Sequence, residues 1–276
     1  MKNSHICMLL ACLACLSSVA EEAKPFNPVA ALTVALDAET EAYCRAAAAR
    51  VPAKGHANVL FLGDSLTDYD RSRNHASIMA HYLEEAHPGA FTVYNYAIGG
   101  DFCSRLWNRM NGRETHRLEA FADIWSRRYD LAFILLGAND SKTSTNNGYK
   151  VPVTPPSLQE KFMGQMIAFL KEKGVRRVVL ISPAVANWPL CQKITAQREK
   201  KRKNCSLFGE PKHLEAFAAV ERRLAESTEG VDFLDIYTPM KARPDAYEMT
   251  RPGDGVHLVD KGYRFVACRL LDYLGK

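Results

Sequence analysis

The sequence predicts an α/β fold in which helices cover both faces of a parallel β-sheet. Short apolar runs typical of buried strands alternate along the chain with segments whose apolar residues recur at helical spacing. Three of these runs end in glycine and polar residues, where an α/β protein commonly turns from a strand into a helix. Because helical connections join parallel strands, we expect the sheet to be buried on both faces.

Five apolar runs are predicted to be strands. They cover residues 59–62, 91–97, 131–136, 175–181 and 231–236. This number of strands favours a five-stranded, doubly wound sheet of the flavodoxin-like kind. The chain has 276 residues, 47% of them hydrophobic, and shows no internal repeat, so we expect one main domain.

Helical spacing predicts a helix after most of the strands. These helices cover residues 74–86, 117–128, 158–173, 212–225 and 260–274. An alanine-rich segment at 28–50 is also expected to be helical, since Pro52 would end it. Residues 141–156 are polar and rich in turn residues, which predicts a surface loop of the kind that shapes substrate pockets. Residues 187–210 are interpreted as an insertion.

The first twenty residues have the pattern of a secretory signal peptide. Lys2 precedes an apolar run at 6–16, and small residues at 18–20 suit a signal peptidase. The run is far shorter than the ~20 residues that a membrane span needs, and no later segment could cross a membrane. We therefore expect a secreted or periplasmic protein. A loose lipobox at 9–12 leaves a lipoprotein anchored at Cys12 as an alternative.

The charge and the cysteines constrain the partners and the compartment. The formal net charge is +5 and becomes +4 if Lys2 leaves with the leader, which is too mild to predict a nucleic-acid partner. The basic segment 198–203 is either a solvated loop tip or a contact for an anionic glycan.

Three of the eight cysteines lie in the leader, and five remain: Cys44, Cys103, Cys191, Cys205 and Cys268. In an oxidising compartment some should pair, and Cys191 with Cys205 is the predicted disulfide.

Three predicted strands end in residues suited to acyl transfer. Each of these strands is broken at its end by a turn, and the three breaks are Gly63-Asp64-Ser65, residues 99–101 and residues 137–140. We expect the breaks to lie close together because parallel strands present their carboxyl ends at one edge of the sheet. A fourth break carries Asp254 and His257. Asp254 can accept from the Nδ1–H of His257, which leaves Nε2 to take the Ser65 proton.

An oxyanion hole can be assembled from the same breaks. The Ser65 N–H, the Gly100 N–H and the Asn139 amide are donors of the kind that stabilise a developing negative charge. Other interpretations remain for single residues, since Ser65 suits a helix cap and Asn139 suits a turn. Asp254 and His257 could form an ordinary surface ion pair. Asp64 is predicted to brace the turn rather than to act as a second catalytic acid.

The four breaks together resemble the sequence blocks of the SGNH hydrolases, also called GDSL esterases and lipases. Gly63-Asp64-Ser65-Leu66 resembles the first block with Ser65 as nucleophile, Gly100 the second, and Asn139 the third. Asp254 and His257 resemble the last block, Asp-x-x-His, and the likeness extends from about Asn58 to the C-terminus. Thr67 stands where the elbow of α/β-hydrolases has glycine, which argues against that family.

This resemblance implies a three-layer α/β/α sandwich, serine hydrolysis of esters, and neither a metal nor an organic cofactor. We divide the chain into a signal peptide (1–20), an N-terminal helical extension (21–50) and an SGNH hydrolase domain (51–276) with the insertion at about 187–210. We expect a secreted serine esterase that removes short acyl groups such as acetyl from carbohydrates, with a small-molecule or glycan ester as its substrate. The alternatives are a lipase or lysophospholipase, an acyltransferase, and a non-catalytic glycan-binding protein. The oligomeric state is left open.

Overall fold

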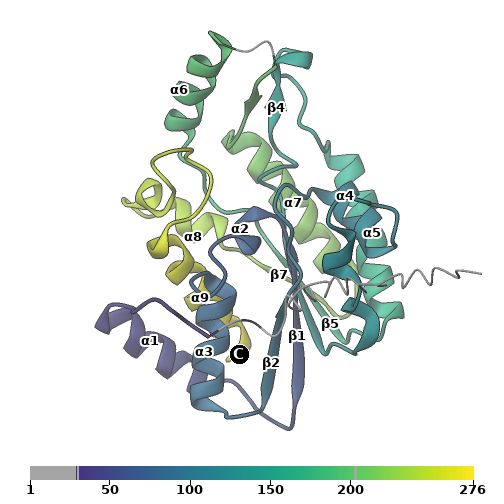
Figure 1. Cartoon of the computed structure of the whole chain (residues 1–276), viewed down its shortest axis with the longest axis vertical. Helices are drawn as coiled ribbons and strands as arrows, with labels where there is room; N and C mark the ends of the chain where they lie inside the picture. Colours follow the sequence, from purple (N-terminus) through teal and green to yellow (C-terminus); the bar gives the residue numbers. More distant parts are fainter. Residues whose placement is uncertain (1–28, 30, 202–203) are drawn as a thin grey trace, which may run out of the picture.

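The computed structural model describes residues 29, 31–201 and 204–276 and contains a five-stranded parallel sheet. The strands lie in the order β2-β1-β3-β5-β7, which is the flavodoxin-like order (Figure 1). Their bounds are β1 Ala57–Gly63, β2 Phe91–Asn95, β3 Leu131–Leu135, β5 Arg177–Ile181 and β7 Val231–Leu234. Each predicted strand is present, so the predicted fold class is confirmed.

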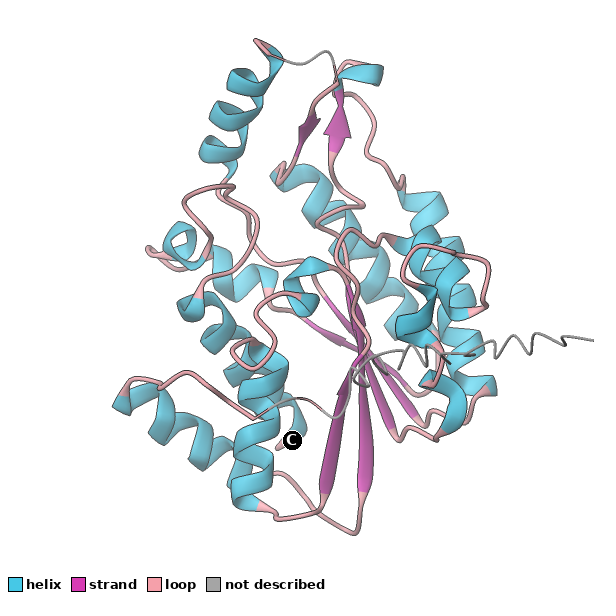
Figure 2. Ribbon diagram, viewed as in Figure 1, coloured by secondary structure: helices cyan, strands magenta, loops and turns pink. Residues whose placement is uncertain are grey.

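Helices cover both faces of the sheet and complete the three layers (Figure 2). One layer contains α1 Ala38–Ala49, α3 His75–Ala86 and α9 Asp260–Leu274, which pack against one another. The other contains α4 Cys103–Met110, α5 Pro156–Glu172 and α7 Pro211–Ser227. Shorter helices, α2 Ser65–Asp68 and α8 Tyr237–Lys241, lie near the carboxyl ends of the strands (Figure 1).

The pleat of the strands divides the core between these layers. In β1, Val59 and Phe61 belong to the core on the α1, α3 and α9 side, whereas Leu60 and Leu62 belong to the core on the other side. Successive side chains of a strand point to opposite faces, so an uninterrupted apolar run is required where both faces are buried. The continuous apolar runs of the sequence therefore fit a sheet enclosed by helices.

Two predicted helices differ from the structure. The helix expected at 28–50 begins only at Ala38, because the Asp37 carboxylate caps it by accepting from the Thr40 N–H at 2.9 Å. The segment 117–128 forms only two short 3-10 turns, Leu118–Phe121 and Ile124–Ser126. Arg117 has a left-handed backbone with φ of 54°, which keeps it out of a helix.

Two short segments that lie 62 to 64 positions apart in the sequence pair with each other. Strand β4 (Thr143–Ser144) lies in the predicted loop 141–156, and β6 (Ser206–Leu207) lies in the insertion 187–210. They form an antiparallel ribbon beyond the carboxyl ends of the main strands, beside helix α6 (Trp188–Glu199) (Figure 1). The loop and the insertion therefore form one structure over that edge of the sheet.

The predicted disulfide between Cys191 and Cys205 is not formed in this structure. Both residues are described and buried, but they are not bonded to each other. The Cys191 Sγ instead lies 3.6 Å from the backbone oxygen of Asp254. The expected signal peptide and the alternative anchor at Cys12 lie outside the described residues. None of the helices in the described part of the chain is long and apolar enough to span a membrane.

Candidate active site

Ser65 lies at the first position of α2, directly after strand β1. Asp64 caps this helix, since its Oδ1 accepts from the Leu66 N–H at 2.9 Å. The predicted bracing role of Asp64 is therefore confirmed. Gly63 permits the sharp exit from the strand, because an added Cβ would lie 2.5 Å from the Leu135 carbonyl oxygen. The result is a serine held at the edge of the sheet with 6% of its surface exposed.

Ser65, His257 and Asp254 form a continuous chain of hydrogen bonds. The His257 Nε2 lies 2.9 Å from the Ser65 Oγ, and the His257 Nδ1 lies 2.9 Å from the Asp254 Oδ2. The other Asp254 oxygen accepts from the backbone N–H groups of Val256 and His257 at 2.7 and 2.9 Å. Burial by itself raises the pKa of Asp254, but these hydrogen bonds outweigh it and lower the pKa to about 2. The carboxylate is therefore charged at neutral pH and orients the imidazole.

Tyr69 also contacts this chain of hydrogen bonds, and the sequence did not single it out. Its ring stacks on the His257 imidazole, with centroids 5.0 Å apart and planes inclined by 25°. Tyr69 itself is exposed. The loop that carries His257 is held by backbone hydrogen bonds. The Arg251 N–H donates to the His257 carbonyl at 2.6 Å, and the Asn187 N–H donates to the Gly255 carbonyl at 2.7 Å.

The predicted oxyanion donors come from three different strand ends. The Ser65 N–H lies in the first turn of α2, where helical N–H groups lack partners within the helix. Gly100 has φ of 86°, a conformation that favours glycine. Asn139 is 7% exposed, and its amide nitrogen also donates to the Asp101 carbonyl at 3.1 Å, which fixes the orientation of the side chain. The sheet thus brings together the residues that the sequence places in separate blocks.

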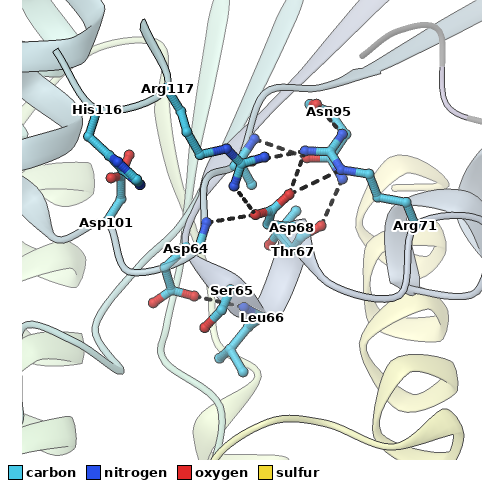
Figure 3. A network of polar contacts seen from close by, with 12 residues as sticks. Asp64, Ser65, Leu66, Thr67, Asp68, Arg71, Asn95, Asp101, His116 and Arg117 are labelled. Atoms are coloured by element: carbon cyan, nitrogen blue, oxygen red, sulfur yellow. Dashed lines mark hydrogen bonds and ion pairs between the residues drawn. The ribbon is translucent and has the colours of Figure 1, made fainter. Parts of the chain in front are cut away.

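A network of ion pairs joins α2, the serine helix, to residues 99–101, the glycine loop (Figure 3). Asp68, at the end of α2, accepts from the Gly99 N–H at 2.7 Å with one oxygen. The same oxygen pairs with Arg117 at 3.1 Å, and the other oxygen pairs with Arg71 at 2.8 Å. Arg71 in turn donates to the backbone oxygens of Asn95 and Ala97. Asp68 thereby fixes the peptide that precedes Gly100 relative to Ser65.

Sequence reasoning missed Asp68, Arg71 and Arg117. Asp68 follows Ser65 by three positions and looks like an ordinary polar residue of a short turn. Arg117 lies 49 positions further on, and only the fold brings its guanidinium to that carboxylate. No sequence pattern identifies such a pair, because neither partner has a characteristic spacing from the other.

A family model of the GDSL-like lipase/acylhydrolase family matches residues 61–265, which is more than half of the chain. The chain belongs to this family. The resemblance to the GDSL esterases and lipases is therefore confirmed. The matched range includes Ser65, Gly100, Asn139, Asp254 and His257. No curated protein is similar enough in sequence to match.

Several solved structures share the fold of this chain at low sequence identity. A lipase/acylhydrolase from Enterococcus faecalis is 17% identical with a TM-score of 0.56, and the match covers 79% of this chain and 95% of that one. An acetylxylan esterase from Geobacillus stearothermophilus is 19% identical with a TM-score of 0.56, covering 82% and 97%. Structures of catalytic mutants of that esterase carry changes at a serine, an aspartate and a histidine.

Several buried acids surround the active-site edge of this GDSL-like fold. Asp101 and Arg109 form an ion pair at 2.8 Å in which neither side chain is exposed. Burial raises the pKa of Asp64 to about 7, and repulsion from Asp140 and Asp101 adds to this effect. The hydrogen bond from the Leu66 N–H lowers the pKa but does not outweigh the burial. Among the described residues, no group of three or more His, Cys, Asp or Glu side chains could hold a metal ion.

Proposed function

We propose that this protein is a serine esterase that hydrolyses esters through an acyl-enzyme. The observation that carries the proposal is the hydrogen-bond chain from Ser65 through His257 to Asp254, with 2.9 Å at both contacts. Membership of the GDSL-like lipase/acylhydrolase family supports it. In the similar acetylxylan esterase, the aspartate and the histidine of the catalytic mutants are three positions apart, as Asp254 and His257 are here.

In this mechanism His257 is the general base and Ser65 the nucleophile. Nε2 of His257 takes the hydroxyl proton while the Ser65 Oγ attacks the ester carbonyl carbon. The N–H groups of Ser65 and Gly100 and the amide of Asn139 stabilise the oxyanion, and the protonated imidazole then gives its proton to the leaving alcohol. Water, deprotonated by the same histidine, hydrolyses the acyl-enzyme and releases the acid.

The proposed substrate is a carbohydrate that carries a short acyl group such as acetyl. Solved structures of one Geobacillus protein, described both as an acetylxylan esterase and as an acetyl-xylooligosaccharide esterase, are similar to this chain over about four fifths of its length, which supports that choice. The polar segment 141–156 and the ribbon of β4 and β6 lie at the same edge of the sheet as Ser65, so a polar sugar is a suitable leaving group. We further propose that the chain is exported by its leader.

The substrate proposal is tested by rates on esters of graded chain length. We expect kcat/KM to be highest for p-nitrophenyl acetate and to fall for the octanoate, and acetate to be released from acetylated xylo-oligosaccharides. Ser65→Ala should abolish both activities and labelling by a fluorophosphonate. Preference for octanoate would favour a lipase instead, and an unreactive Ser65 in the wild type would contradict the esterase altogether.

A further inference from the structure

Two cysteines from opposite ends of the chain face each other between α1 and α9. The Cys44 and Cys268 sulfur atoms are 3.8 Å apart, although the residues are 224 positions apart in sequence. Cys44 is fully buried, whereas Cys268 is partly exposed and lines a cavity of about 450 Å³ between the two helices. A reagent in this cavity can therefore reach Cys268 before it reaches Cys44.

The two helices are held together by polar contacts on both sides of this thiol pair. Before Cys44 in α1, the Asp37 carboxylate pairs with Arg264 of α9 at 2.6 Å. On the other side, Asp272 accepts from the Tyr43 hydroxyl at 2.5 Å and from Arg50 at 3.2 Å. These contacts hold the two helices side by side. The sulfurs need only close from 3.8 Å to the ~2.05 Å of a disulfide.

We propose that Cys44 and Cys268 are joined by a disulfide bond that ties the N-terminal helix to the C-terminal helix. Both residues lie outside the 61–265 range that the family model matches, so the crosslink is a property of this chain rather than of the shared fold. The proposal depends on export into an oxidising compartment and is independent of the esterase activity.

The bond forms by exchange with an oxidised disulfide, either a small one such as oxidised glutathione or that of an exported oxidoreductase. The Cys268 thiolate attacks the donor disulfide, its S–S bond breaks, and one donor thiolate leaves. Cys44 then loses its proton and attacks the mixed disulfide, which releases the second donor thiolate and forms the Cys44–Cys268 bond. The hydrogen bond from Cys44 lowers the pKa of the Cys268 thiol, which suits Cys268 to the first attack.

The other described cysteines have different surroundings. Cys103 is fully buried, and its backbone N–H donates to Asp140 at 2.8 Å. Cys191 faces the Asp254 carbonyl oxygen, and the Cys205 N–H bonds to the Thr145 hydroxyl oxygen at 3.1 Å. After removal of the leader, the oxidised protein should therefore contain two thiols fewer than the reduced protein.

The experiment is a thiol count combined with peptide mapping. Purified protein lacking residues 1–20 is equilibrated with oxidised glutathione, alkylated under denaturing conditions, and digested without reductant. We expect two alkylated cysteines fewer than in the reduced protein, and a linked peptide pair that contains Cys44 and Cys268. Alkylation of all five cysteines, or a linkage that joins different cysteines, would overturn the proposal. Neither outcome depends on ester hydrolysis, so it leaves the proposed function untouched.

Thermal unfolding provides a second readout with a matched control. Reductant should lower the wild-type Tm by roughly 5 to 10 °C, since the crosslink closes a very long loop. In Cys268→Ser the reductant should have no effect, whereas Cys191→Ser should keep the full shift. An equal shift in Cys268→Ser and wild type would contradict the crosslink. If Cys268→Ser does not fold, the thiol count on the wild type still decides.

Discussion

At Gly63 an added Cβ would overlap the Leu135 carbonyl oxygen, and at Gly100 the backbone has a positive φ. The sequence indicated both glycines as turn residues, because backbone constraints of this kind admit few other residues. It did not indicate a role for Asp68 or Tyr69. Their effect on the site comes through contacts with Gly99 and His257 that only the folded chain creates.

Asp68 is predicted to act as a positioning residue for the oxyanion hole. Asp68→Asn removes the negative charge that pairs with Arg71 and Arg117, and it weakens the anchor on the Gly99 N–H. We expect kcat for p-nitrophenyl acetate to fall about 10- to 100-fold with little change in KM, since losing an oxyanion donor outright costs more. Steady-state kinetics measure this split.

The matched control for Asp68 is Asp123→Asn, which removes the ion pair with Arg127. This pair flanks the 3-10 turn Ile124–Ser126 and contacts neither Ser65 nor Gly99. The kcat of Asp123→Asn should equal that of the wild type. Equal losses of kcat in the two variants would indicate general destabilisation and contradict a positioning role for Asp68.

The buried Asp64 predicts that stability declines as the pH rises. Because burial raises its pKa to about 7, folded Asp64 keeps a proton that the unfolded chain loses near pH 4. Between these two values the folded state binds more protons, so the free energy of unfolding falls with rising pH. The shift corresponds to at most about 4 kcal/mol across this window.

Asp64→Asn removes this titration and keeps an oxygen that can accept from the Leu66 N–H. Urea unfolding at pH 5 and at pH 8 should therefore show a smaller loss of stability in the variant than in the wild type. An identical pH dependence in the two proteins would show that Asp64 does not titrate in this range.

At the scale of elements, the strands and the helices α3, α5, α7 and α9 followed from periodicity, whereas α6, which lies in the predicted insertion, and the segments between the other elements did not. Helix α4 was missed although Cys103, Leu106 and Met110 recur at helical spacing, because the helix has only eight residues. The segment 117–128 looks helical by composition, but Arg117 takes a left-handed conformation and its side chain pairs with Asp68. A tertiary contact overrides local preference at this point.

Asn74 connects two elements and is predicted to stabilise both. Its side-chain oxygen caps α3 by accepting from the Ser77 N–H, and its nitrogen donates to the Thr67 and Tyr69 carbonyls at 2.8 and 3.0 Å. Asn74→Ala should lower the free energy of unfolding by about 2 to 3 kcal/mol. Asn74→Ser keeps the cap but cannot donate in the same way, so its loss should be smaller. Urea denaturation gives both values, and equal losses would contradict a contribution from the cap.

At the scale of the whole molecule, the order β2-β1-β3-β5-β7 brings residues from 63 to 257 to one edge of the sheet. The N-terminal helix also belongs to this assembly. Cys44, Ala47 and Ala48 of α1 are fully buried in the core that α3 and α9 share. Helix α1, which precedes the family match, is therefore part of the same hydrophobic core.

Deletion of residues 1–50 is predicted to destabilise the entire domain. The deletion exposes the apolar faces of α3 and α9 that α1 covers, so the protein should unfold at lower temperature and aggregate. Deletion of residues 1–20, the expected leader, is the matched control and should leave Tm and activity unchanged. Calorimetry and soluble yield measure the difference. A deletion to residue 50 with an unchanged Tm would show that α1 does not contribute to the core.

The sequence by itself determined the fold class, the strands and the blocks around Ser65, Gly100, Asn139 and His257. Apolar periodicity and glycine at constrained turns are local requirements, and local requirements can be recognised in a linear chain. The tertiary structure alone decided that Asp68 joins the serine helix to the glycine loop, that β4 pairs with β6, and that Cys268 faces Cys44. These contacts join residues far apart in the chain, and their partners are set by how the helices and loops pack around the sheet.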